Sequence, residues 1–134
     1  MSIRFGTVLV CDNIYRDVDS NKIILAGVFS GTITVPLVPS LVRLSLYAEF
    51  FAKQADDYSV ELQIFLGDKK YGGLKSKMMI AASTSPSILS TPQIDLIVDK
   101  NNTLIVKAII DGGKPKVIFR KEIVVAAPIV DPTV

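Results

Sequence analysis

The chain has 134 residues, which is enough for one domain with a substantial core. Apolar residues make up 49% and charged residues 21%, values that are typical of a globular protein and exclude a disordered one. The 15 basic and 13 acidic residues give a net charge of +2, too small a surplus to predict a nucleic-acid-binding surface.

Histidine is absent from the sequence, and Cys11 is the single cysteine. Without histidine, Ser-His-Asp, Cys-His and His-based zinc chemistry are excluded. One cysteine forms no internal disulfide, which fits a reducing compartment. No apolar run reaches the roughly 20 residues of a membrane-spanning helix, and Val8–Cys11 is too short for a signal-peptide core. We therefore expect a cytoplasmic protein with no membrane partner.

The first 21 residues predict one strand, a break and a polar turn. Phe5–Cys11 is a β-branched, apolar strand, and the turn-forming pair Asp12-Asn13 is expected to end it. Ile14–Arg16 is a short extended segment. Asp17–Asn21 reads Asp-Val-Asp-Ser-Asn, which is typical of an Asx-rich turn.

A second strand is predicted at Lys22–Phe29. It is apolar nearly throughout, so we expect both of its faces to be covered. Gly27 inside it indicates a bulge or a close backbone approach. Gly31–Val35 continues as a strand, and the prolines of Pro36–Ser40 make that segment a connector.

Leu41–Phe51 alternates with period two, which predicts a strand with one face toward solvent. The expected buried face carries Leu44, Leu46, Ala48 and Phe50, and the expected wet face carries Arg43, Ser45, Tyr47 and Glu49.

The remaining pattern predicts further strands at Tyr58–Leu66, Leu74–Ala82, Gln93–Val98, Thr103–Ile110 and Val117–Val125. Lys53–Asp57 and Asp111–Pro115 are expected to be loops, and Gly67–Lys70 a turn. The Ser, Thr and Pro content of Ser83–Pro92 predicts a crossover between sheets.

Regularly spaced strands without an amphipathic helix predict an all-β fold, an antiparallel, Ig-like β-sandwich of seven to eight strands. Residues 1–126 form a single domain in this prediction, and residues 127–134 a C-terminal tail. The residues predicted to lie in the core are Val8, Ile24, Leu46, Leu62, Ile64, Leu96 and Ile105.

The carboxylates of the sequence match a metal site or a catalytic acid pair only in part. Asp17–Asn21 begins like a calcium loop, but Lys22 and Val28 stand where such a loop needs Gly and Glu. A site completed by Asp56 and Asp57 is conceivable, although the pattern favours a solvated turn. The pairs Asp95 with Asp99 and Asp12 with Asp17 match glycosidase carboxylates only in residue type, so no catalytic or metal-binding residue is predicted.

Cys11 could be a reactive thiol or a buried, inert one. A reactive thiol needs a nearby cation or a helix N-terminus, and the sequence offers neither beside it. We therefore expect a buried, inert thiol.

Two basic groups are candidates for an anion-binding face. The first comprises Lys69, Lys70, Lys75 and Lys77, and the second Lys114, Lys116, Arg120 and Lys121. If the strands brought them together, Tyr71 and Phe119 could stack on bases of single-stranded nucleic acid. The competing interpretation, which we favour, is that lysines on exposed strands protect sheet edges from pairing.

The opening block resembles a family of small bacterial all-β proteins without an assigned activity. The resemblance rests on VLVCD at Val8–Asp12, NKIILAGVF at Asn21–Phe29 and the Pro36–Pro39 connector. It covers the first third to half of the chain, implies a β domain, and implies no catalytic residue.

Together these features predict a non-catalytic binding module or assembly subunit, not an enzyme, and without a cofactor. The high apolar content favours a protein partner or a homo-oligomer. Met78 and Met79, on the weakest strand, are candidate contacts because methionine adapts to irregular surfaces. The alternative is binding of a small anion, a nucleotide or single-stranded nucleic acid through the lysine-rich strands.

Overall fold

The structure, a computed structural model, describes residues 3–82 and 85–126. Within these residues it contains ten strands and no helix, so none that could cross a membrane. The strands are β1 (Ile3–Arg16), β2 (Ile23–Val28), β3 (Ile33–Val35), β4 (Ser40–Ala52), β5 (Asp56–Leu66), β6 (Lys69–Ile80), β7 (Ser87–Ser90), β8 (Ile94–Val98), β9 (Asn102–Ile110) and β10 (Lys116–Val125). The tail predicted at residues 127–134 lies outside the described residues.

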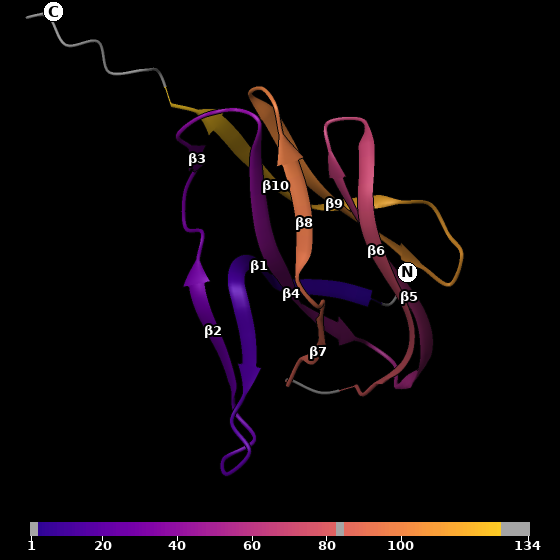
Figure 1. Ribbon diagram of the computed structural model, residues 1–134. Coiled ribbons are helices and arrows are strands. Elements are labelled where there is room, and N and C mark those ends of the chain that lie inside the picture. Colours follow the sequence, from indigo (N-terminus) through magenta and orange to yellow (C-terminus); the bar gives the residue numbers. More distant parts are fainter. Residues whose placement is uncertain (1–2, 83–84, 127–134) are drawn as a thin grey trace, which may run out of the picture.

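Two sheets pack face to face around one core (Figure 1). One sheet has the order β2-β1-β4-β7, with β8 also paired to β4, and the other has the order β3-β10-β9-β5-β6. Pairings among the described strands are antiparallel, apart from the parallel pairing of β3 with β10. The predicted all-β, antiparallel β-sandwich is therefore confirmed, with ten strands in the described residues where seven or eight were expected.

The core is built from alternate residues of the central strands, as period-two burial requires. Leu46, Leu62, Ile64 and Leu96 are all fully buried, which confirms four of the predicted core residues. Val8 is half-buried and packs against this core.

The prediction for Ile105 is wrong because the apolar run of β9 does not reveal its phase. Leu104 and Val106 face the core and are fully buried, whereas Ile105 is half-buried on the outer face. Lys107 has the same parity as Ile105, and its ammonium lies 4.6 Å from the centre of the Phe65 ring on that outer face. The only charged side chain of the strand therefore marks the outward face.

The alternation predicted for β4 holds on its core face but not fully on its other face. Ser45 and Tyr47, expected to be wet, are both buried. In the ladder Ser45 lies opposite Cys11, and Tyr47 lies between Leu9 and Ser90. Neighbouring strands on both sides shield this part of the outer surface.

Several predicted turns belong to strands instead. β1 runs through Asp12-Asn13, because Asn13 pairs with Ala26 of β2. β6 begins at Lys69, so the turn before it is shorter than Gly67–Lys70. Part of the predicted crossover forms β7, which pairs with β4, while residues 83–84 lie outside the described residues.

Candidate functional site

The hairpin of β1 and β2 leaves the body of the sandwich. β1 pairs with β4 from Ile3 to Cys11, and beyond Cys11 its ladder partners come from β2. Figure 1 shows this hairpin extending below the two sheets. We call residues 12–27 the β1–β2 arm.

The tip of the arm is closed by its own polar side chains. The Asp17 carboxylate accepts hydrogen bonds from the Ser20 hydroxyl at 2.7 Å and from the Asp19 N–H at 3.1 Å. These two bonds lower the pKa of Asp17. Asn21 takes the left-handed conformation at φ 59°, which asparagine tolerates in turns. The predicted Asx turn is confirmed, and its leading carboxylate is already satisfied without a cation.

Apolar side chains are exposed along the arm and at its base. Exposed fractions are 52% for Tyr15, 94% for Val18, 49% for Ile24 and 40% for Val28. The expectations that Ile24 belongs to the core and that β2 is covered on both faces are therefore wrong. The reason is topological, because β2 is the end strand of its sheet and lies beyond the opposing sheet.

The outer edge of β2 carries unpaired backbone groups. Across the hairpin the Lys22 carbonyl accepts the Asp17 N–H at 2.8 Å, so the backbone of Lys22 points toward β1. Backbone direction alternates along an antiparallel strand, so the N–H and C=O of Ile23 and Leu25 point away from β1. No strand of the described chain lies on that side of β2.

Asp12 and Gly27 form a special junction in the arm. Gly27 has φ +68°, and a Cβ placed there would overlap the Asp12 carboxylate. The carboxylate of β1 therefore reaches over the strand β2 at a position that has no side chain. The bulge or close approach expected from Gly27 is confirmed as a close approach.

Cys11 lies at the base of the arm and is fully buried. Burial raises the pKa of its thiol, and the sulfur donates to the carbonyls of Asn13 and Ser45 at 3.4 and 3.7 Å. The predicted buried thiol is confirmed.

The first basic group lies on the opposite free edge. Its members are Lys69, Lys70, Lys75 and Lys77, all on β6. β6 is the end strand of the second sheet, and these four side chains are exposed. Lys75 lies opposite Glu61 of β5, and the Lys69 ammonium lies 4.8 Å from the centre of the Tyr71 ring.

The two candidate methionine contacts on β6 point in opposite directions. Met79 is 61% exposed, whereas Met78 is half-buried and packs against the core. Adjacent strand residues face opposite sides, so only Met79 is presented to solvent.

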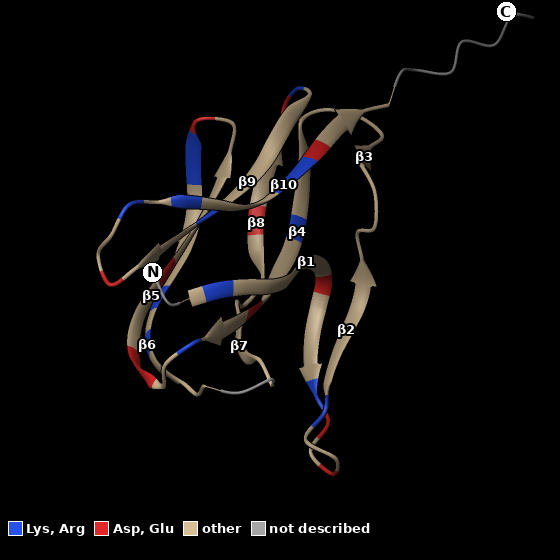
Figure 2. Cartoon of the chain, turned by 180° about the vertical axis from the view of Figure 1, so that it is seen from behind, with Lys and Arg blue, Asp and Glu red and all other residues tan. Residues whose placement is uncertain are grey.

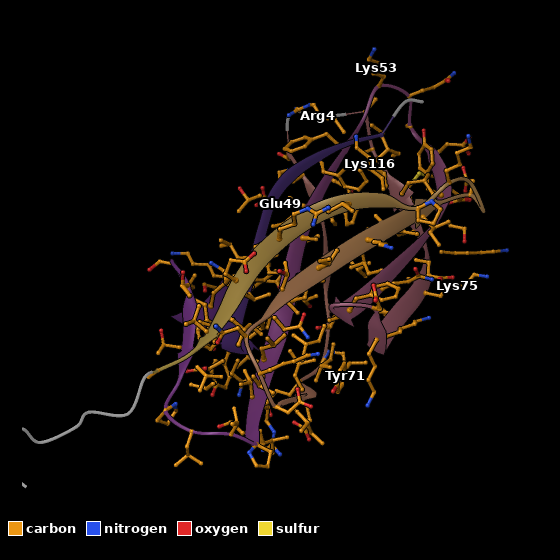
Figure 3. All side chains as sticks on the ribbon, turned by 90° about the horizontal axis from the view of Figure 1, so that it is seen from above. Arg4, Glu49, Lys53, Tyr71, Lys75 and Lys116 are labelled. Carbon is orange, nitrogen blue, oxygen red and sulfur yellow. The ribbon has the colours of Figure 1, made fainter. Side chains whose placement is uncertain are left out.

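The second basic group does not join the first. Its members are Lys114, in the loop before β10, and Lys116, Arg120 and Lys121 of β10. β9 and β5 separate β10 from β6, a distance of three strand spacings or about 14 Å. Figure 3 shows Lys75 and Lys116 at separate places on the surface.

The individual contacts of this second group are local. The ammonium of Lys121 donates to the Gly31 carbonyl at 2.7 Å and lies 5.6 Å from the Phe119 ring centre. That of Lys116 lies 5.4 Å from the ring centre of Phe5. Tyr71 and Phe119, the suggested stacking residues, belong to different strands and do not form one platform.

Acidic residues do not gather into a site in the described part of the chain. No group of three or more Cys, Asp and Glu side chains there could hold a metal ion. Asp95, half of one considered acid pair, accepts a hydrogen bond from Arg43 at 2.7 Å. That hydrogen bond lowers the pKa of Asp95.

The geometry thus defines a β-sandwich in which the end strand β6 carries lysines and the end strand β2 carries no charge. The end strands β3 and β7 are also uncharged, but they have only three and four residues. Figure 2 shows β2 free of charged positions, while β6 carries several. The sequence analysis missed the β2 edge because an apolar six-residue run looks the same in a buried strand and in an uncovered one.

No protein-family model and no curated protein matches this chain. Membership of the family that the opening block resembles therefore stays a prediction.

Among solved structures, the chain is similar to the CARDB domain of the PF1109 protein from Pyrococcus furiosus, solved in complex with di-metal ions. The identity is 9% and the TM-score 0.46, over 93% of this chain and 96% of that one. It is also similar to the β-glucosidase EmGH1 from Erythrobacter marinus, at 12% identity and a TM-score of 0.40, and to the Pseudomonas fluorescens alkylpurine DNA glycosylase AlkC bound to DNA, at 10% and 0.35. These matches cover 92% of this chain but only 15% and 30% of the other two.

Proposed function

We propose that this domain is a non-catalytic interaction module that binds an extended polypeptide segment along the free edge of β2. The observation that carries the proposal is an uncharged, unpaired edge on an arm with exposed apolar side chains. Natural sheets normally protect such an edge with charge, proline or a covering element, because it pairs readily with other chains.

Strand addition uses the features that β2 presents. The outward N–H and C=O groups of Ile23 and Leu25 supply main-chain hydrogen bonds to an added strand. Tyr15 and Ile24 are ladder partners and therefore share one face of the arm, where they offer apolar contact to side chains of the added strand. Affinity then comes from the backbone and specificity from these side chains.

The arm also gains stability when a strand is added. Beyond Cys11 it is a two-stranded hairpin, and a hairpin of two strands is only marginally stable in water. A third strand extends the ladder and covers apolar side chains, so binding and ordering of the arm reinforce each other.

The alternative function, anion or nucleotide binding through the lysines, stays a prediction. Its two basic groups lie on different strands and make separate local contacts. No observation here favours it over edge protection by the lysines of β6.

A peptide with the sequence of residues 21–29 is a suitable probe, with a scrambled peptide of the same composition as control. We expect NMR shifts and slower amide exchange at Ile23 and Leu25 with the first peptide only.

Ile24→Lys adds a charge beside the β2 edge and is expected to weaken peptide binding at least about tenfold, or ~1.4 kcal/mol. The matched control Met79→Lys places the same charge on β6 and should leave binding unchanged. Equal binding of both peptides, or shifts centred on β6, would contradict the proposal.

A further inference from the structure

We infer that the strand added to β2 is β2 of a second copy of this chain, in an antiparallel pairing centred on Leu25. This inference rests on the proposed function, because it names the partner of the same edge. It joins the two arms into one four-stranded ribbon with the order β1-β2-β2′-β1′, where the prime marks the second copy.

The backbone directions permit this register. Ile23 and Leu25 both point their hydrogen-bonding groups outward, and in an antiparallel pair two such residues must face each other. Centring the ladder on Leu25 sets Leu25 opposite Leu25 of the second copy, where the main-chain hydrogen bonds form. Ile23 then lies opposite the other copy's Gly27, whose left-handed φ of +68° ends the regular ladder at that point. The pairing is two-fold symmetric, so it consumes both β2 edges and closes as a dimer.

The charges of the arm are complementary in this register. On β1, Arg16 is the ladder partner of Ile23, and Asp12 reaches over Gly27. Four residues therefore lie side by side in a row across the four strands of the dimer. Arg16 and Ile23 come from one copy, and Gly27 and Asp12 follow from the other copy. Antiparallel partners share a face, so all four side-chain positions lie on one side of the ribbon.

The glycine in that row lets the opposite charges approach. Arg16 and Asp12 of the other copy are three strand spacings apart, about 14 Å between Cα atoms, before either side chain extends. The Asp12 carboxylate already lies over Gly27, on the way toward the free edge. In the single copy the Arg16 guanidinium donates to the Asn21 Oδ1 at 2.8 Å, so in the dimer Arg16 would leave Asn21. Extended toward the second copy instead, it brings the two charges within roughly a Debye length, about 8 Å at physiological salt. Symmetry makes this interaction twice.

The other end of the sandwich does not offer the same pairing. β6 carries four lysines along its length, so two copies of it would face each other with like charges. The β2 edge can thus form one self-complementary contact, whereas the β6 edge of the second sheet is protected by its lysines.

The test measures the mass of the full chain by size-exclusion chromatography with light scattering over a dilution series. We expect a dimer for the wild type and for Met79→Lys, and a monomer for Ile24→Lys. Amide exchange at Ile23 and Leu25 should slow as the protein concentration rises.

A charge exchange tests the register itself. Asp12→Lys and Arg16→Glu alone each create like-charge rows and are expected to weaken the dimer roughly tenfold, since two rows are affected. The double variant restores opposite charges and should recover most of the affinity. Because the arm's net charge is the same in the double variant and the wild type, recovery cannot come from a change in overall charge.

The outcomes separate this inference from the proposed function. A wild-type monomer that still binds the 21–29 peptide at β2 would overturn the second copy as partner and retain strand addition. A dimer that survives Ile24→Lys, or single charge variants that dimerise as tightly as the wild type, would overturn the β2 pairing. A monomer that also fails to bind the peptide would overturn both.

Discussion

The strands β2 and β6, which end different sheets, present the same backbone chemistry to solvent and very different side chains. β6 carries Lys69, Lys70, Lys75 and Lys77, whereas β2 reads Ile-Ile-Leu-Ala-Gly-Val without a charge. The difference is not one of exposure, since Ile24 at 49% and Met79 at 61% are both open to solvent.

This contrast indicates that one edge is protected and the other is available. Lysine on an edge strand opposes pairing, because a docking strand would have to bury or repel its charge. The same sandwich thus disfavours association at β6 and permits it at β2.

The largest expected effect comes from replacing Gly27, whose backbone conformation shapes the junction between β1 and β2. Gly27→Val forces a β-branched residue into φ +68° and displaces the Asp12 carboxylate, so we expect a loss of roughly 1–3 kcal/mol in stability. Urea denaturation measures it. Gly31→Val is the matched control, because no atom lies within 4 Å of a Cβ there, and it should cost no more than about 0.5 kcal/mol. Equal losses for both variants would show that the junction of Asp12 and Gly27 has no special role.

Removing the protection from β6 is expected to make the two edges alike. The double variant Lys75→Val, Lys77→Val leaves residues 74–80 of β6 without a charge, and this half of the strand should associate and raise light scattering with concentration. Its unfolding free energy should stay within about 0.5 kcal/mol of the wild type, because both side chains are exposed. The control Lys75→Arg, Lys77→Arg keeps the charges and should not associate. A double valine variant that behaves like this control would argue against edge protection.

Alkaline pH should loosen the sheet that carries β2. Burial, together with the hydrogen bond that the Tyr47 hydroxyl donates to Glu49, raises the pKa of Tyr47 from 10.0 to about 12. The folded state holds this proton more tightly, so the stabilisation is complete below pH 10 and is lost as pH rises toward about 12. Thermal melts between pH 9 and 12 measure the slope. Tyr47→Phe should flatten it, and an unchanged slope in that variant would assign it to other groups.

The smallest expected effect concerns the tip of the arm. Ser20→Ala removes the hydrogen bond that lowers the pKa of Asp17 most, so that pKa should rise toward its ordinary value of 3.8. The ionised Asp17 carboxylate stabilises the turn. This stabilisation is present at pH values above the ordinary pKa, and it is lost as the pH falls through the lowered pKa of the folded state. An NMR titration of the Asp17 side chain follows the change, with Ser30→Ala as the control. A pKa that does not move would mean that the Ser20 hydroxyl does not hold the turn.

Strand positions in the central part of the chain could be predicted because polar and apolar residues alternate there. The Leu44, Leu46, Ala48 and Phe50 series faces the core as the pattern of β4 indicated. In β9 the run Leu104-Ile105-Val106 is apolar throughout, so it does not show which residues face the core. The charge of Lys107 identifies the outer face only once the structure shows that Lys107 points outward. The open edge of β2 was harder still to predict from the sequence, because Ile23–Val28 has the apolar composition of a strand that is covered on both faces.

The sequence by itself determined the class of fold and the chemistry that is excluded. Period-two burial, turn residues such as those of Asp17–Asn21, and the lack of histidine are local or compositional properties, so they can be read without a partner. Only the tertiary structure decided which strands end the sheets. The strand β2 is open because no strand of the described residues lies beyond it, and the two basic groups are separate because β9 and β5 lie between them. Those facts depend on strand order, which contacts far apart in the chain establish and which no local pattern encodes.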